Sequence, residues 1–528
     1  MRAHATALVL ALTTTLGAQD APTHDLLLRG GTVVDGTRRP GVVADVAVRG
    51  GRIVAIGDLR GATAARTIDC TGLVVAPGFV DVHAHADSEV ARNPQCGNFL
   101  QMGVTTIVTG NCGSSVRDLA AHFARIEAGG VGVNYGSLVG LGTVRTAVMG
   151  TEKRDPTAEE LARMEQLVDE GMRHGAFGVS TGLIYVPGTY ATTAEITALA
   201  KVAARHGGLY ASHMRNEAND VLTSVAEALQ VGRDAGIHVQ VSHVKCSGRP
   251  NWGRSREVLD ALLAARRSGQ SVTADQYAYD ASSTSLDVLF PSAELAIGRK
   301  EFAARLRDDA TFRAAMKQAL HATMDRVGFG DLRYARIASA PGNSSLAGLT
   351  IAEAAAKVKG SDDRDAQAEM AMDLFAASAG ERVGMVYHVM SEEDVATFLA
   401  EDWIAIASDA GLRLPSADKP HPRGSGNNPR VLGRHVRERG VLDLPLAVHK
   451  MTRLPAQVFG IAERGEVRVG WHADLAVFDP ATVLDQATYQ DPLLPPVGIP
   501  YVVVNGTVAV DQGTLAPGRA GRVLRRNG

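Results

Sequence analysis

The 528-residue sequence has few of the features that mark small disulfide-bonded proteins or nucleic-acid-binding proteins. Its 4 cysteines include no CxxC pair, so neither a disulfide framework nor a structural zinc knuckle is indicated. Its 54 lysines and arginines are outnumbered by 57 acidic residues. Without a surplus of positive charge to neutralise phosphates, nucleic acid is excluded as the main partner. Only 5% of the residues are aromatic, against 56 glycines, which favours many tight turns over an aromatic recognition surface.

Long hydrophobic runs are also missing. No segment offers eighteen consecutive apolar residues, so we expect no stable insertion into a membrane. The first residues combine one positive charge at Arg2, a short apolar run and small residues at Gly17 and Ala18. This is the plan of a cleavable signal peptide, which we place at residues 1–18. We therefore expect a periplasmic or secreted bacterial protein, the alternative being an ordinary buried N-terminal helix.

A short apolar strand, a polar loop and an alanine-rich helix recur along most of the chain. Eight such strands can be counted between residues 73 and 411. Strands buried on both faces that alternate with helices imply a parallel sheet, and eight units close into a (β/α)8 TIM-type barrel. We predict this α/β barrel over residues 76–455. The interval 286–391 is too long for one crossover and is expected to hold a helical insertion.

The two ends of the chain have a different pattern. Residues 24–75 and 456–528 contain apolar strands and glycine-containing turns with almost no helix between them. We expect these two segments to pair with each other and to form one small β-sandwich domain.

Potential metal ligands fall at the ends of the predicted barrel strands, where barrel enzymes place their active residues. His83 and His85 are two positions apart on one strand, so both point to the same face and can chelate zinc or a similar divalent ion. Four other strand ends carry Cys112, His213, His243 and Asp409. A lone histidine or cysteine is more often structural, but six potential ligands at one rim predict a metal site.

Several longer segments surround these residues. They are APGFVDVHAHAD (76–87), GVTTIVTGNCGSS (103–115), STGLIYVPGTYA (180–191), SHMRNE (212–217), VSHVKCSGRPNWGRS (241–255) and PHPRGSG (420–426). Together they resemble the amidohydrolase superfamily and, within it, the N-acyl-D-amino-acid deacylases (D-aminoacylases). The HxH pair marks only the superfamily, whereas the GNCG cysteine with SHMRNE and SHxK is specific to the D-aminoacylase branch.

The resemblance implies a function and a set of roles. The expected reaction is zinc-dependent hydrolysis of an N-acyl-D-amino acid to a D-amino acid and a carboxylate. Cys112, His213 and His243 match a tight zinc site. His83, His85 and Asp409 match a second, weaker site, with the Cys112 sulfur able to bridge. Asp409 is expected to act as general base and then as general acid.

The resemblance also suggests how the substrate is held. Lys245, Tyr185 and Arg423 are candidates for binding its α-carboxylate, with Ser283 or Ser285 nearby. Arg299 or Lys300 could pair with an acidic side chain of the substrate. The preferred side chain, the acyl group, the number of working metals and the oligomeric state stay open.

Two other functions remain compatible with the sequence. One is a related amidohydrolase that acts on dipeptides containing a D-residue or on cyclic amides. The other is a catalytically inactive binding protein on the same barrel, because one fold hosts many functions. The complete set of six ligands argues against the inactive protein, which has no physical need to keep it.

Overall fold

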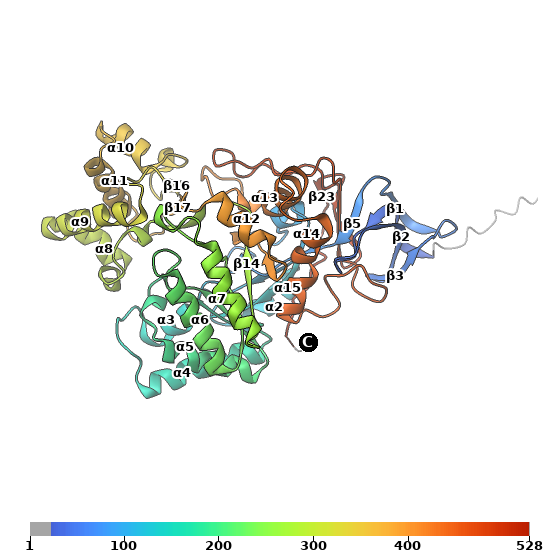
Figure 1. Cartoon of the computed structure of the whole chain (residues 1–528), viewed down its shortest axis with the longest axis horizontal. Helices are drawn as coiled ribbons and strands as arrows, with labels where there is room; N and C mark the ends of the chain where they lie inside the picture. Colours follow the sequence, from blue (N-terminus) through green and yellow to red (C-terminus); the bar gives the residue numbers. More distant parts are fainter. Residues whose placement is uncertain (1–22, 527–528) are drawn as a thin grey trace, which may run out of the picture.

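The computed structural model describes residues 23–526 as an α/β protein, and the predicted signal peptide at residues 1–18 lies outside this range. Figure 1 shows three parts along the long axis: a β-sheet at one end, the helices α8 to α11 at the other, and parallel strands with their helices between them. Among the described residues, no helix combines the length and the apolar character that crossing a bilayer requires.

The central part consists of short parallel strands in three hydrogen-bonded groups. The first group is β6 (Phe79–Asp81), β8 (Val104–Thr109) and β9 (Asn134–Ser137). The second is β10 (Val139–Gly140), β11 (Gly178–Gly182), β12 (Leu209–His213), β13 (His238–Val241), β14 (Val272–Gln276) and β18 (Ile404–Ile406). The third is β7 (Ala84–His85) with β19 (Ala410–Gly411). Every residue of β8, β11, β12 and β14 is buried, as expected for strands that are covered on both faces.

Helices connect and cover these strands. They are α1 (Gly97–Gln101), α2 (Leu119–Gly129), α3 (Leu141–Met149), α4 (Ala158–Arg173), α5 (Thr193–Arg205), α6 (Val221–Ala235), α7 (Ser255–Arg267), α12 (Glu392–Ala400), α13 (Arg423–Arg430), α14 (Leu444–Met451) and α15 (Arg453–Phe459). The sequence marks several starts, for example Thr157 before α4, whose hydroxyl accepts from the Glu160 amide while the Glu160 side chain accepts from the Thr157 amide.

The first of the eight predicted strands, which was expected to run over residues 73–85 and to carry His83 and His85, is instead three pieces, β5 (Val74–Pro77), β6 and β7. Pro77 and Gly78 interrupt it, and a Cβ on Gly78 would lie 2.2 Å from Oγ1 of Thr105, so no larger residue fits there. The chain also bends at residues 82–83, so that His83 follows β6 rather than lying within a strand.

Strands from both ends of the chain form one nine-stranded sheet. Its members are β1 (His24–Val33), β2 (Val42–Arg49), β3 (Arg52–Gly57), β4 (Ala64–Asp69), β5, β20 (Leu475–Phe478), β21 (Tyr501–Val504), β22 (Thr507–Asp511) and β23 (Thr514–Leu515). The two ends meet where β5 pairs antiparallel with β20, with Ala76 opposite Ala476. A separate apolar core, which includes Leu28, Val48 and Leu475, lies under this sheet.

The long interval before α12 contains helices and a small sheet. The helices are α8 (Arg299–Asp308), α9 (Ala310–Val327), α10 (Ile351–Lys359) and α11 (Arg364–Ala377). The strands β15 (Ser282–Ser285), β16 (Ala335–Ser339) and β17 (Gly384–Tyr387) pair antiparallel. The prediction of a purely helical insertion was therefore incomplete, because β16 and β17 fall inside the interval and add to β15 at the cavity described next.

Candidate metal centre and active site

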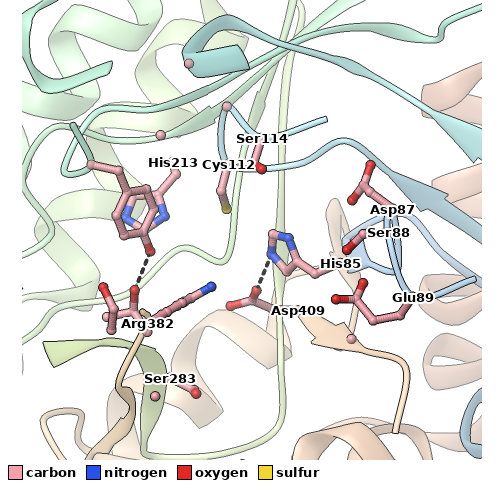
Figure 2. A pocket seen from close by; sticks show the side chains of 18 of the residues that line it. His85, Asp87, Ser88, Glu89, Cys112, Ser114, His213, Ser283, Arg382 and Asp409 are labelled. Carbon is pink, nitrogen blue, oxygen red and sulfur yellow. Dashed lines mark hydrogen bonds and ion pairs between the residues drawn. The ribbon is translucent and has the colours of Figure 1, made fainter. Parts of the chain in front are cut away.

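A cavity of about 1180 Å³ opens where the parallel strands end. It is lined by residues at or after the ends of different strands, among them His85 at the end of β7, Cys112 after β8 and His213 at the end of β12. Strands β15 and β17 form another part of the wall through Ser283 and Gly384. Figure 2 shows Cys112 and Asp409 near the middle of this cavity, between His213 on one side and His85 on the other.

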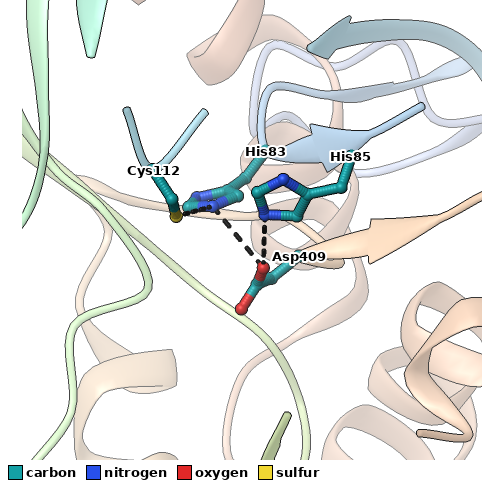
Figure 3. Close-up of side chains that lie close together, drawn as sticks. All are labelled: His83, His85, Cys112 and Asp409. Carbon is teal, nitrogen blue, oxygen red and sulfur yellow. Dashed lines mark hydrogen bonds and ion pairs between the residues drawn. The ribbon is translucent and has the colours of Figure 1, made fainter. Parts of the chain in front are cut away.

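Four of the predicted ligands lie together, with their donor atoms within 4.8 Å of one another: His83, His85, Cys112 and Asp409. Nε2 of His83 is 3.3 Å from the Cys112 sulfur and 3.6 Å from Oδ1 of Asp409. Nε2 of His85 is 3.0 Å from the same carboxylate oxygen (Figure 3).

The Cys112 sulfur also belongs to a second group, with His213 and His243. It lies 3.4 Å from Nε2 of His243, and that nitrogen lies 2.9 Å from Nδ1 of His213. One sulfur therefore joins two neighbouring sets of donor atoms: the first adds two imidazoles and a carboxylate to it, and the second adds two imidazoles.

The chemistry of these donors fits a metal ion such as zinc. Burial alone would raise the pKa of the Cys112 thiol, but the charges and hydrogen bonds of His83, His213 and His243 hold it well below its usual range. A thiolate beside several imidazoles is a soft, borderline donor set that suits Zn²⁺. Nε2 of His213 is buried and has no hydrogen-bond partner in the described range, whereas its Nδ1 faces Nε2 of His243.

The backbone is strained where it presents these ligands. Cys112, His243 and Asp409 have φ angles of 51°, 34° and 52°, in the left-handed region that non-glycine residues rarely adopt. Such strain persists only where surrounding structure enforces it, and it concentrates at functional sites.

Buried carboxylates orient two of the rings. Oδ1 of Asp275 lies 3.0 Å from Nδ1 of His83, and Oε1 of Glu217 lies 3.0 Å from Nδ1 of His243. An Nδ1 that donates to its carboxylate leaves Nε2 facing the cluster as the nitrogen available to a metal ion. Nζ of Lys245 also lies 2.7 Å from Nδ1 of His243. Asp275 also accepts from the His243 amide at 2.8 Å, so it fixes backbone and ring together.

Sequence reasoning missed both carboxylates. Asp275 lies within the predicted strand β14, and Glu217 is the last residue of the SHMRNE segment. Both segments were identified from the sequence, but neither carboxylate was assigned a role. Their partners are on other strands, and only the arrangement of the strands reveals the contact.

Asp409 is paired with a buried arginine on its other oxygen. Nη1 of Arg423, the first residue of α13, lies 2.9 Å from Oδ2 of Asp409. Burial would raise the pKa of Asp409, but the charge of Arg423, with that of His83, holds it well below its usual range. The Arg423 guanidinium also lies over the ring of Tyr277, 4.6 Å from its centre.

The predicted substrate-binding residues all line the cavity, namely Lys245, Tyr185, Arg423, Ser283 and Ser285. Nζ of Lys245 donates to Oε1 of Glu217 at 2.7 Å. The hydroxyl of Thr284 donates to the hydroxyl of Tyr185 at 3.0 Å. Ser283 donates to the carbonyl of Met385 at 2.9 Å.

The two residues suggested for an acidic substrate side chain differ in position. Arg299 lines the cavity but is held by Asp287 at 2.5 Å. Lys300 is not among the residues that line it.

Known proteins match the chain over nearly its full length. A model of the amidohydrolase family matches residues 66–510. The D-aminoacylase of Alcaligenes xylosoxydans xylosoxydans is 37% identical over 97% of this chain and 99% of its own length. The N-acyl-D-glutamate deacylase of the same organism is 37% identical over 95% and 97%. The structure of N-acyl-D-glutamate deacylase from Bordetella bronchiseptica, complexed with zinc and a phosphonate that mimics the tetrahedral intermediate, aligns with a TM-score of 0.81, at 36% identity over 95% of this chain and 99% of that one.

Proposed function

The chain belongs to the amidohydrolase family, and we propose that it hydrolyses the amide bond of N-acyl-D-amino acids to give a D-amino acid and a carboxylate. The observation that carries this proposal is the convergence of four imidazoles, one thiolate and one carboxylate at one end of the parallel strands. Full-length likeness to deacylases of D-amino-acid derivatives supports the substrate class.

We infer that Cys112, His213 and His243 hold one zinc ion tightly, and that His83, His85 and Asp409 form a second, weaker site with the Cys112 sulfur. The distances within each group and the presence of zinc in the Bordetella bronchiseptica relative support this assignment. When bound, zinc supplies an activated water near neutral pH and polarises a carbonyl oxygen.

The residues of the chain then move one proton. Asp409, kept ionised by Arg423, accepts a proton on its carboxylate from the water that attacks the amide carbon. As the C–N bond breaks, the same carboxyl group returns the proton to the leaving nitrogen. The products are the carboxylate of the acyl group and the amine of the D-amino acid.

Orientation of the substrate comes from the cationic and hydroxyl groups around Asp409. Nε of Arg423 is buried without a hydrogen-bond partner in residues 23–526, so it is free to donate to the substrate's α-carboxylate. Lys245, Tyr185, Ser283 and Ser285 lie on the same cavity and can hold it further. A fixed α-carboxylate and a fixed amide carbonyl leave the two enantiomers with different positions for the side chain, which permits selection of one.

We also propose the architecture that carries this site. The parallel strands from β6 to β19 close into a (β/α)8 barrel, and residues 24–75 and 456–528 form a small β-sandwich domain. Support comes from the likeness to D-aminoacylase structures and from the strand groups, which run in chain order from β6 to β18. The leader-like composition of residues 1–18 supports export to the periplasm or secretion.

The test is an assay of purified, zinc-loaded protein with the D and L forms of N-acetyl-methionine, N-acetyl-leucine, N-acetyl-glutamate and N-acetyl-aspartate, following the free amine. Hydrolysis of D forms alone establishes the proposed function. Turnover of none of them despite bound zinc, with cleavage of a D-residue dipeptide or a cyclic amide, would replace it with the alternative reaction.

A further inference from the structure

A buried histidine outside the cavity contacts the arginine that pairs with the proposed base. His421 is fully buried and is not among the residues that line the cavity, although Pro420 and Arg423 are. Its Nδ1 lies 3.0 Å from the backbone nitrogen of Arg423, and its Nε2 lies 2.9 Å from the carbonyl oxygen of Ala281. The imidazole therefore bridges the start of α13 and the residue before β15.

These two partners fix the protonation of the ring. The amide of Arg423 can only donate and the carbonyl of Ala281 can only accept, so Nε2 of His421 carries the proton and Nδ1 accepts. A protonated imidazole would lose the bond to Arg423 and would place a second positive charge beside its guanidinium. Burial, followed by the charge of Arg423, lowers the pKa of His421 well below its usual range, which agrees with the neutral ring.

The bond to Arg423 takes the place of a helix cap. Arg423 is the first residue of α13, and the first amides of a helix have no partner within the helix itself. The residue before it is Pro422, whose side chain has no oxygen that could accept from this amide. His421, one residue earlier, supplies the acceptor instead. The imidazole therefore sets the position of the first turn, and with it that of the Arg423 side chain.

Aromatic rings hold both members of this pair. Tyr279 lies perpendicular to the His421 ring at 5.1 Å between centres, and Tyr489 lies at 5.4 Å and 77°. Tyr277, two residues before Tyr279, lies under the Arg423 guanidinium at 4.6 Å. One segment of the chain thus supports the imidazole and the guanidinium together.

The rest of α13 has anchors of its own. Oδ1 of Asn427 accepts from the Ala278 amide at 2.9 Å, and Nε of Arg430 donates to the Ala278 carbonyl at 2.7 Å. Loss of the His421 bonds should therefore disturb the first turn, where Arg423 lies, without unfolding the helix.

We propose that His421 is a positioning residue for the hydrolysis: through its bond to the Arg423 amide, it holds the guanidinium where it meets both Asp409 and the substrate's α-carboxylate. This role rests on the proposed function and adds a residue that acts on the reaction without touching the substrate. A displacement of about 1 Å can lower the rate of a positioned reaction by about 100-fold, so a small shift of Arg423 is enough to be measured.

Three substitutions separate the two bonds of the ring. His421→Asn carries its amide oxygen as many bonds from Cα as Nδ1, so it keeps an acceptor for the Arg423 amide. His421→Gln carries its amide nitrogen as many bonds from Cα as Nε2, so it keeps a donor for the Ala281 carbonyl. His421→Leu removes both. The matched control is His449→Leu, which removes a half-buried imidazole whose Nδ1 lies 2.8 Å from the Gly36 carbonyl, away from the cavity.

The first readout is hydrolysis of N-acetyl-D-leucine by the zinc-loaded enzyme. We expect kcat/KM to fall by about 10- to 100-fold in His421→Leu and His421→Gln. His421→Asn should restore it to within about threefold of wild type, and His449→Leu should stay in the same range.

A double variant shows whether His421 acts through Arg423. In an Arg423→Lys background, His421→Leu should lower kcat/KM by less than about threefold, because little is left for the imidazole to position. Equal losses in His421→Asn and His421→Leu, or the full loss in the Arg423→Lys background, would make His421 a merely structural residue and overturn the proposal.

A binding measurement tests the same role without turnover. Isothermal titration of the zinc-loaded protein with D-leucine is compared with titration by 3-methylbutylamine, the same molecule without its carboxylate. We expect His421→Leu to weaken D-leucine binding by about tenfold, the range of a hydrogen bond to a charged group, and to leave the amine within about threefold. His421→Asn should restore D-leucine binding.

This result would support the role of His421 even if no N-acyl amino acid is cleaved. D-leucine that binds wild type and His421→Leu equally would overturn it, while hydrolysis of N-acetyl-D-leucine by the wild type would leave the deacylase function standing.

Discussion

Nη1 of Arg423 lies 2.9 Å from Oδ2 of Asp409, and both side chains are buried. The pair joins the first turn of α13 to the residue before β19. It keeps the carboxylate ionised beside the imidazoles of His83 and His85, which is the state that a general base requires before it accepts a proton. Nε of the same arginine has no hydrogen-bond partner in residues 23–526, so we propose that this one side chain links proton transfer to substrate binding.

Removal of the base should abolish turnover without emptying the tight zinc site. In Asp409→Asn, we expect kcat to fall by about 10² to 10⁴, the usual contribution of a positioned general base. Zinc content by mass spectrometry should stay near one ion per chain, since Cys112, His213 and His243 are unchanged. Asp418→Asn, which removes an exposed carboxylate from the same cavity, is the control and should retain activity. Full activity in Asp409→Asn would assign the base to another residue.

The carboxylates behind the histidines should matter for metal affinity. Glu217→Gln and Asp275→Asn remove the acceptors that orient His243 and His83. Each substitution should weaken zinc binding by about 10- to 100-fold, which is typical for partners of metal-ligating histidines. Competition with a chromogenic chelator measures this directly, and Glu257→Gln on the surface of α7 serves as the control. Unchanged affinity in both variants would show that the two carboxylates do not orient ligands.

Lys450 should make stability depend on pH in the alkaline range. Its side chain is fully buried, its Nζ donates to the carbonyl of Leu399, and burial lowers its pKa to about 7. Between that value and the unfolded pKa near 10.4, the unfolded chain binds more protons than the folded one, so this group makes stability rise with pH, by at most about 1.4 kcal/mol per unit. Below about pH 7 its cost is constant.

The measurement is urea unfolding between pH 6.5 and 9.5. Lys450→Met should lose this upward slope, whereas Lys359→Met, which removes a lysine paired with Asp373 on the insertion, should keep it. Identical slopes in wild type and Lys450→Met would mean that Lys450 is charged in the folded protein.

Gly78 should be irreplaceable for steric reasons. Gly78→Ala would place a Cβ within 2.2 Å of Oγ1 and 2.7 Å of Cβ of Thr105, between the segment that leads to His83 and the strand β8 that leads to Cys112. We expect a loss of about 1–3 kcal/mol in the free energy of unfolding, as for other overpacked sites. Gly61→Ala, at an exposed position with no atom within 4 Å of the added Cβ, should change stability by less than about 0.5 kcal/mol. Equal stability of the two variants would contradict this account.

The sequence predicted the family correctly, because the GNCG cysteine and the histidine-bearing segments are short motifs that can be recognised without knowing the fold. The structure brings the six predicted ligands together, while their roles as ligands stay a prediction. What local pattern could not provide was contact between distant segments. The roles of Glu217 and Asp275 became evident only from the imidazole rings of His243 and His83, which they contact.

The insertion illustrates a second limit. β16 and β17 are short, and β15, which pairs antiparallel with β17, precedes the helices α8 and α9, so no alternation within the interval indicated a sheet.

The central claim is that this metal-dependent hydrolase acts on N-acyl-D-amino acids. Its most direct test is the ratio of kcat/KM for the D and L forms of one N-acetyl amino acid, measured with zinc-loaded protein and repeated after chelation. The account predicts a ratio above about 100, equivalent to roughly 2.7 kcal/mol of discrimination, and no hydrolysis of either form after zinc removal. Equal rates for the two enantiomers, or full activity without metal, would contradict it.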